Sequence, residues 1–415
     1  MRLESGEMLP EGWRWVAMKE VCELNPRRPA IDCSDSMPTT FVPMEAVDDV
    51  MGKMDTSATR PYSVVKKGYT YFQEGDVVFS KITPCMQNGK HAIAHGLLDG
   101  IAFGTTEFHV IRPGPEIDAH WLHSYLRRPE ILREAERHFT GAVGQRRVPI
   151  SFLEELEIPL PPLPEQKRIA AILTERLAAV EQARKASEAR LEAARALPAA
   201  YLREVFESEE ARGWPEVLLG DVLLCIEAGK SFQTGEIQAC ENELGVLKVS
   251  AVTWSSFKPD EAKVVNDYEP ESHHRVCNGD LLISRANTKE LVGAAVLVNK
   301  DYPLRLLSDK TLRLVVDPEQ ADKLYLLHSL RSSPARKHIE HFATGTSDSM
   351  RNISQGVIKS TPIRLPDLNT QRRIAGYLYT KSKSADDASI AIQEQLIEIK
   401  RLASSLLRQA FSGAL

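Results

Sequence analysis

The sequence predicts an α+β protein in which two globular domains are joined by two long helices. Three observations predict this class. The chain has 415 residues, which is longer than one ordinary domain. An internal repeat has a period of about 205 residues, far above that of a solenoid unit. Two segments rich in helix-forming residues have equal length in both copies. We expect globular domains at 1–160 and 212–366, and connecting helices at 161–211 and 367–415.

The repeat is visible inside the two globular halves. Gly75–Lys81 (GDVVFSK) returns as Gly279–Arg285 (GDLLISR). The spacing between other matching segments differs by a few residues between the two copies. The two halves are therefore expected to share a fold and to differ in detail.

The segments after the globular halves match without any insertion. Phe206 lies 40 residues after Gln166, and Phe411 lies 40 residues after Gln371. About 40 residues at a rise of 1.5 Å make a helix of about 60 Å. Pro198 is expected to kink the first helix or to break off its last two turns.

A spacing of seven residues runs along both connecting segments and predicts a seam between two helices with a left-handed supercoil. The positions of this seam are Leu173, Val180, Ser187, Ala194 and Tyr201 in the first copy, and Leu378, Ala385, Ile392, Ile399 and Leu406 in the second. The alternative is that each helix packs back on its own domain. Because such a helix overhangs a domain of about 150 residues, we expect an antiparallel coiled-coil pair that relates the domains by a pseudo-twofold axis.

Each globular half is expected to contain strands followed by a helical segment, near 118–138 and 320–342. Short runs of apolar and β-branched residues, separated by Gly, Asn and Pro turns, indicate the strands. These runs are Val77–Phe79, Phe108–Ile111, Leu281–Ile283 and Leu312–Val316. The strands are expected to form a sheet or a partial barrel.

Composition excludes several classes of protein. No apolar run reaches the 18 or so residues of a membrane helix, and the first residues lack the apolar core of a signal peptide, so we expect a cytoplasmic protein. The six cysteines form no CxxC pair, so neither a disulfide scaffold nor a zinc site is expected. The net charge of −5 argues against nucleic-acid binding over the whole surface.

Basic residues concentrate near the end of each globular half. Between Arg127 and Arg147 the net charge is +3, and between Arg331 and Arg351 it is +2. Arg, Gln and Asn make bidentate contacts with guanine and adenine, and Lys and Arg neutralise phosphates. The candidate DNA-binding residues are Lys81, Gln145, Arg146, Arg147, Arg285, Arg351 and Asn352. A solvated surface loop is the alternative for each stretch, but recurrence in both halves favours binding.

No catalytic, cofactor-binding or metal-binding residue is predicted. Gly229-Lys230-Ser231 ends like a phosphate-binding loop, but Leu224 occupies the position of the required earlier glycine, so the cradle of backbone amides is missing. An enzyme with an unrecognised site in the globular halves, such as a nuclease, remains one alternative. A coiled-coil scaffold whose two domains bind other proteins is another.

The segments that lead into the long helices carry a family resemblance. Leu160–Ala170 reads LPPLPEQKRIA and Leu365–Ala375 reads LPDLNTQRRIA, with Asn369-Thr370 in place of Pro164-Glu165. Duplicated at this spacing, these motifs resemble the specificity subunits of type I restriction–modification enzymes over essentially the whole chain.

The resemblance implies that each globular half is a target-recognition domain that reads one half of a split site on double-stranded DNA. The paired helices would set the distance between the halves and dock two methyltransferase subunits. These subunits would bring S-adenosylmethionine, and restriction subunits would bring ATP-driven translocation and cleavage. The chain itself would be non-catalytic and would hold no cofactor.

Overall fold

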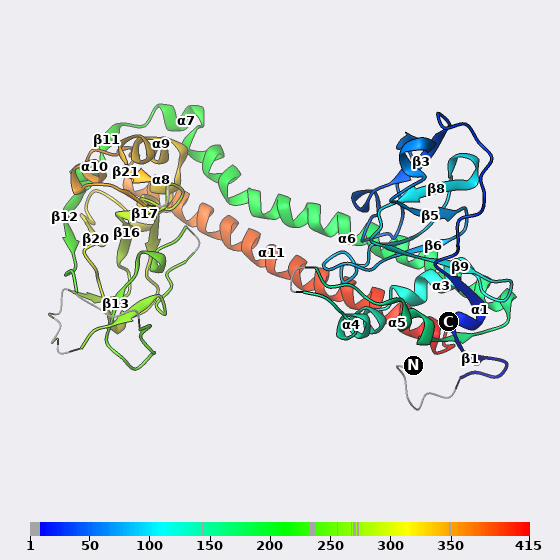
Figure 1. Cartoon of the computed structure of the whole chain (residues 1–415). Coiled ribbons are helices and arrows are strands. Elements are labelled where there is room, and N and C mark those ends of the chain that lie inside the picture. Colours follow the sequence, from blue (N-terminus) through cyan, green and yellow to red (C-terminus); the bar gives the residue numbers. More distant parts are fainter. Residues whose placement is uncertain are drawn as a thin grey trace. The chain divides into compact units, whose positions relative to one another are not determined.

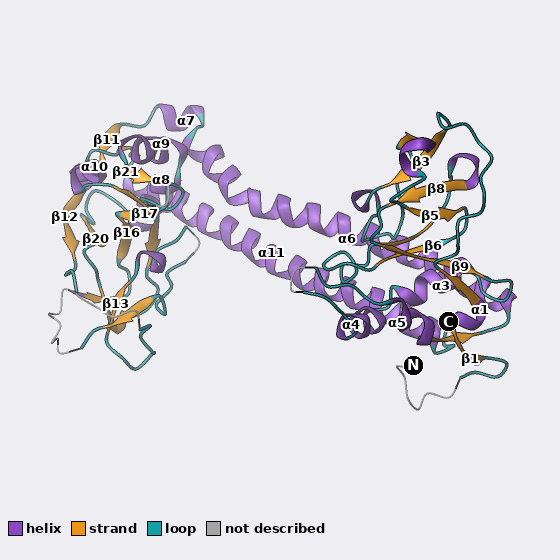
Figure 2. Ribbon diagram, in the orientation of Figure 1, coloured by secondary structure: helices purple, strands orange, loops and turns teal. Residues whose placement is uncertain are grey.

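The structure is a computed structural model. It describes residues 9–142, 145–232, 237–254, 256–266, 268, 271, 274–347 and 350–415. The chain divides into two compact units. Unit 1 consists of Met1–Ala189 and Ile392–Leu415, and unit 2 consists of Arg190–Ala391. Both units mix helices and strands (Figures 1 and 2), which confirms the predicted α+β class. The predicted domain boundaries stay a prediction.

The described part of unit 1 contains two four-stranded sheets and a two-stranded sheet. The first four-stranded sheet has the order β2 (Cys22–Leu24), β9 (Phe108–Pro113), β6 (Val77–Ser80), β7 (His91–Ile93). The second has the order β4 (Thr59–Pro61), β3 (Pro38–Val42), β8 (Ile101–Gly104), β5 (Thr70–Gln73). β3 and β8 run parallel, and the other pairs are antiparallel. β1 (Arg14–Ala17) pairs with β10 (Glu157–Leu160), just before the first long helix begins.

The described part of unit 2 repeats this topology. The two four-stranded sheets have the orders β12 (Leu223–Ala228), β20 (Thr311–Val316), β16 (Leu281–Ser284), β18 (Ala295–Leu297) and β14 (Ala262–Val264), β13 (Gly245–Leu247), β19 (Tyr302–Leu306), β15 (Arg275–Val276). Again one pair, β13 and β19, is parallel. β11 (Glu216–Leu218) pairs with β23 (Pro362–Arg364), as β1 pairs with β10. A sheet of β17 (Ala286–Asn287), β22 (Met350–Asn352) and β21 (Thr344–Ser347) completes the unit. The sequence repeat is therefore a repeat of fold.

The predicted helical segment of each globular half is two helices rather than one. They are α3 (Ala119–Leu126) and α4 (Pro129–Arg137) in unit 1, and α8 (Lys323–Arg331) and α9 (Ser333–Phe342) in unit 2. The break falls at an extended residue, Arg128 in unit 1 and Ser332 in unit 2, and a proline lies in the first turn of each second helix, where its missing N–H costs no helical hydrogen bond. Short helices fill the remaining connections: α1 (Met18–Val21), α2 (Tyr62–Val65), α5 (Ile150–Glu155), α7 (Glu209–Arg212) and α10 (Gln355–Lys359).

The two long helices are α6 (Leu163–Phe206) and α11 (Leu368–Phe411). The prediction that Pro198 breaks off the end of α6 is wrong, because the helix continues through this proline to Phe206. The predicted seam is confirmed by burial, since its central positions Ser187, Ala194, Ala385 and Ile392 are all buried.

Within each unit, the start of one long helix packs against the end of the other. In unit 1, Ile169 and Leu173 of α6 share a core with Leu406 and Phe411 of α11. In unit 2, the corresponding core joins Ile374 and Leu378 of α11 to Phe206 of α6. The helices are thus antiparallel in each unit, as predicted. The core of each globular half is completed by the last turn of the long helix that started in the other unit.

The glutamine of the repeated motif fastens each long helix to its globular half. Gln166 is buried; its Nε2 donates to the carbonyl oxygens of Glu116 and Pro161, both at 2.9 Å, and its Oε1 accepts from the backbone N–H of Asp118 at 2.8 Å. Gln371 binds the equivalent backbone groups of unit 2. A buried amide must satisfy its polar atoms, so the motif that carries the resemblance serves the fold.

Candidate nucleic-acid interface

In unit 1, two separate segments that carry predicted DNA-binding residues lie side by side. Lys81 follows β6 directly, and its carbonyl oxygen accepts from the N–H of Val148 at 2.9 Å. The N–H of Thr83 donates to the carbonyl oxygen of Arg146 at 3.1 Å. We call residues 81–83 and 145–148 basic edge 1.

Unit 2 forms the same arrangement, which we call basic edge 2 (residues 285–287 and 351–353). Arg285 follows β16, and its carbonyl oxygen accepts from the N–H of Ile353 at 2.8 Å. In the adjoining sheet, Ala286 pairs with Asn352 and Asn287 pairs with Arg351. The shared register makes Lys81 and Arg285 equivalent, and likewise Arg146 and Arg351, and Arg147 and Asn352. The structure thus gathers all seven predicted residues into two equivalent clusters.

A bidentate ion pair distinguishes basic edge 1. Arg147 donates from Nε to Oε2 of Glu107 and from Nη2 to Oε1, both at 2.8 Å. Its Nη1 donates to the carbonyl oxygen of Gln145 at 3.1 Å. The hydrogen bond from Arg147 holds the pKa of the Glu107 carboxyl below its usual value, and the positive charges of Arg147 and Lys81 act in the same direction.

His109 anchors basic edge 1 to the sheet behind it. Its Nε2 lies 2.9 Å from the carbonyl oxygen of Val148 and its Nδ1 lies 3.2 Å from Nδ2 of Asn25. A carbonyl accepts only from a protonated nitrogen and the amide Nδ2 donates, so this neutral ring carries its proton on Nε2. Burial is the main reason why the pKa of His109 lies below its usual value.

The other predicted residues differ in exposure. Gln145 and Arg146 are exposed, whereas Arg285, Arg351 and Asn352 are half-buried. Arg351 donates from Nη1 to the carbonyl oxygen of Gly345 at 3.4 Å. Four residues of the basic stretches Arg127–Arg147 and Arg331–Arg351 lie outside the described residues: Val143, Gly144, Asp348 and Ser349. The DNA-binding roles of the seven candidates stay predictions.

Two neighbours of the basic edges were not among the predicted residues. The N–H of Lys81 donates to the carbonyl oxygen of Glu107 at 2.9 Å, and the N–H of Arg285 donates to that of Lys310 at 2.9 Å. Glu107 and Lys310 therefore occupy equivalent positions with opposite charges. Each directly precedes an equivalent strand, β9 or β20, and aligning these strands in the repeat is the signal that finds the pair.

Metal-binding groups and membrane-spanning helices are absent from the described residues. There, no three His, Cys, Asp or Glu side chains are grouped so that they hold a metal ion. No helix in that part of the chain has both the length and the apolar character needed to span a bilayer. All six cysteines are free thiols.

Comparisons of sequence agree with the resemblance. Residues 10–190 match the family model described as the type I restriction modification DNA specificity domain. The chain is 26% identical to the EcoEI specificity subunit of Escherichia coli, over 97% of this chain and 83% of that protein. It is 36% identical to the EcoAI specificity subunit of E. coli, over 50% of this chain and 36% of that protein.

Solved structures share the fold. The HsdS subunit from Thermoanaerobacter tengcongensis matches with a TM-score of 0.66 at 24% identity, over 99% of this chain and all (100%) of that one. A chain from a study of the assembly and conformational transition of the type I R-M system matches with a TM-score of 0.74 at 24% identity, over 98% of this chain and 100% of that one. Residues 10–190 thus carry the type I restriction modification DNA specificity domain, and the chain as a whole is similar in sequence to type I DNA specificity subunits and shares the fold of a solved HsdS subunit.

Proposed function

We propose that this chain recognises a bipartite site on double-stranded DNA for a type I restriction–modification enzyme through its two basic edges. As a specificity subunit it is non-catalytic. The observation that carries the proposal is the recurrence of one cationic arrangement, in the same register, in both units.

The chemistry of the basic edges supports direct reading of bases. Lys81 and Arg285 are cations in equivalent positions, suited to phosphates, while Arg and Asn side chains suit base edges. The equivalent positions 147 and 352 carry different side chains, Arg147 and Asn352. Two units with one backbone arrangement and different side chains are suited to two different half-sites.

We infer the partners from the similarity to this family. We propose two methyltransferase subunits that bring S-adenosylmethionine and restriction subunits that bring ATP, with this chain holding neither cofactor. An enzyme that acts on cellular DNA in this way works in the cytoplasm. The net charge of −5 fits such an assembly, because partner subunits would supply further phosphate contacts.

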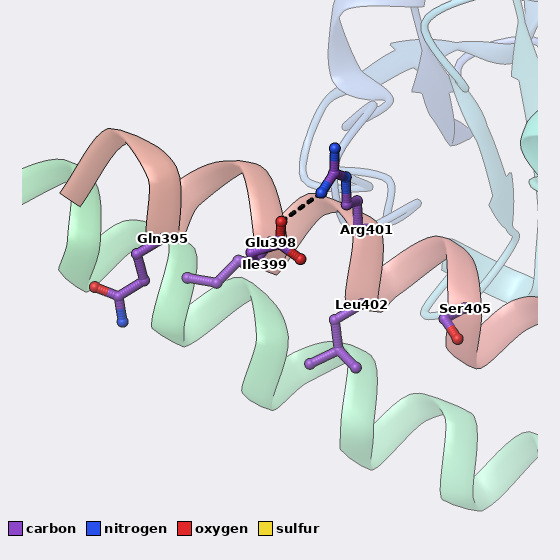
Figure 3. A pocket seen from close by; sticks show the side chains of 6 residues that line it. All are labelled: Gln395, Glu398, Ile399, Arg401, Leu402 and Ser405. Atoms are coloured by element: carbon purple, nitrogen blue, oxygen red, sulfur yellow. Dashed lines mark hydrogen bonds and ion pairs between the residues drawn. The ribbon is translucent and has the colours of Figure 1, made fainter. Parts of the chain in front are cut away.

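The end of α11 offers a face for such a partner. Ile397 and Leu402 are 51% and 50% exposed. A pocket beside them is lined by residues of this helix alone, among them Ile399, Leu402 and Ser405 (Figure 3), with a Glu398–Arg401 ion pair at its rim. We propose that these two exposed side chains and the pocket form part of the surface that a partner subunit covers.

The test is binding of duplex DNA by the chain in complex with its methyltransferase subunit. The dissociation constant is measured against salt concentration, with a random duplex and with a duplex carrying the methylated motif of the host. We expect a steep salt dependence on both duplexes, because phosphate contacts release counterions, and tighter binding of the motif. Arg147→Ala or Arg351→Ala is expected to weaken binding of the motif by about 1–3 kcal/mol. Binding that ignores both salt and sequence would support the protein-binding scaffold instead.

A further inference from the structure

We infer that Glu107 is a specificity-determining residue: it braces Arg147 so that this arginine reads a guanine in the half-site bound by unit 1. The inference rests on the proposed function, because it assumes that basic edge 1 faces DNA. It adds a residue and a base to that function.

The geometry leaves one side of the guanidinium for a ligand. Glu107 occupies Nε and one N–H of Nη2, and the carbonyl oxygen of Gln145 takes one N–H of Nη1. Arginine has five N–H donors. One N–H of Nη1 and one N–H of Nη2 remain, and neither has a partner among the described residues. The side chain of Arg147 is 41% exposed, so this pair is open to solvent.

Guanine matches this pair of donors. Its O6 and N7 lie together in the major groove and accept two hydrogen bonds from one arginine, whereas adenine presents a donor beside its N7. A guanidinium held in one orientation discriminates between these patterns. A freely rotating arginine can contact a phosphate equally well, and phosphate contacts carry no sequence information.

The carboxylate of Glu107 does not increase the affinity of basic edge 1 for DNA. It lies next to Lys81 and Arg147, where it repels the phosphates that these cations would attract. Stability does not account for it either, because a partly exposed ion pair contributes little to folding. An orienting role accounts for both the position of Glu107 and its two-point contact with Arg147. Fixing the side chain before binding also reduces the entropy lost on binding.

Unit 2 has no arginine at the position equivalent to Arg147. Position 352 carries asparagine, whose short side chain makes bidentate contacts with adenine. The position equivalent to Glu107 is Lys310, which is exposed and suited to a phosphate. The acid and the arginine are thus both present in unit 1 and both replaced in unit 2.

The experiment maps the methylated motif of the complete complex. Wild-type chain, Glu107→Gln, Arg147→Lys and the control Glu116→Gln are each expressed with the methyltransferase subunit in a host that lacks adenine methylation. The methylated sites are then sequenced. Glu116 is matched to Glu107, since it also forms an ion pair in unit 1, with Arg14, but it follows the end of β9 whereas Glu107 precedes its start.

We expect Glu107→Gln and Arg147→Lys to relax the same G·C base pair in one half-site. Loss of one good bidentate contact corresponds to about a 5- to 150-fold fall in discrimination. The other half-site and the Glu116→Gln motif are expected to be unchanged. Binding of random DNA by Glu107→Gln is expected to be as tight as wild type or tighter, because a negative charge is removed beside phosphates.

Three results would separate the possible failures. A wild-type complex without a bipartite motif refutes the proposed function. A normal wild-type motif that Glu107→Gln leaves intact refutes only the brace. Relaxation of both half-sites by Glu107→Gln also refutes the brace, because its effect must be confined to one. Should Glu107→Gln fail to assemble, Arg147→Lys decides, since it keeps the carboxylate and removes the bidentate fork; an unchanged motif in that variant overturns the inference.

Discussion

Replacing Phe411 with alanine tests whether the end of the chain belongs to the core of unit 1. Phe411 is 1% exposed. Its ring centroid lies 4.3 Å from that of Trp121 and 5.1 Å from that of Tyr125, and the guanidinium of Arg128 lies 5.4 Å from it. The last turn of α11 thereby fills the space beside α3.

The magnitude follows from these contacts. Truncating a buried phenylalanine to alanine costs about 3–5 kcal/mol through lost burial and the cavity left behind. Each aromatic pair contributes about 0.5–1.5 kcal/mol beyond its buried area, so two such pairs place Phe411→Ala in the upper part of that range. Leu402→Ala is the matched control on the same helix: Leu402 is 50% exposed, and we expect a change within about 0.5 kcal/mol.

The assay is equilibrium urea denaturation, with hydrogen exchange read peptide by peptide. We expect Phe411→Ala to lower the free energy of unfolding of unit 1 and to weaken the protection of amides in α3, while amides of α8 in unit 2 keep theirs. A loss below about 1 kcal/mol, or equal loss of protection in both units, would refute the assignment of Phe411 to this core.

Three further predictions concern buried polar groups. Gln166→Leu leaves a buried N–H and two carbonyls without their partner, so we expect it to lower the unfolding free energy by about 1–3 kcal/mol; urea denaturation that shows no loss would contradict the fastening role. Asp76→Asn breaks the bidentate pair with Arg112, in which Asp76 is 1% exposed, and a loss of about 3 kcal/mol is expected; a melting temperature equal to wild type would count against it. Burial, with a nearby arginine as the smaller cause, lowers the pKa of His123 to about 3 and that of His328 to about 4. The unfolded chain, with a histidine pKa of about 6.5, therefore binds more protons, and stability that is full above pH 6.5 falls on acidification toward these folded values. Each histidine is expected to remove about 2 kcal/mol between pH 7 and pH 5, and denaturation midpoints that are equal at the two pH values would refute this.

Local patterns in the sequence predicted the elements of the fold. The strands β6 and β16 follow from short apolar runs in a repeated context, and the long helices follow from composition and seven-residue spacing, because these periods reflect backbone geometry. The single helical segments predicted near 118–138 and 320–342 missed the break before each proline. Pro198 was expected to kink α6 or to break off its last two turns; these turns stay helical, and packing of Phe206 into the core of unit 2 stabilises them.

The sequence by itself determined that the chain contains an internal repeat, that its two connecting helices have equal length, and which segments concentrate positive charge. Only the tertiary structure decided that Phe206 completes the core of unit 2 and Phe411 that of unit 1, that Gln166 fastens a helix, and that Glu107 holds Arg147. The physical reason is the separation along the chain of the residues that come into contact. Periodicity and composition record contacts between neighbours along the chain, whereas a core or an ion pair joins residues whose proximity arises only when distant segments pack together.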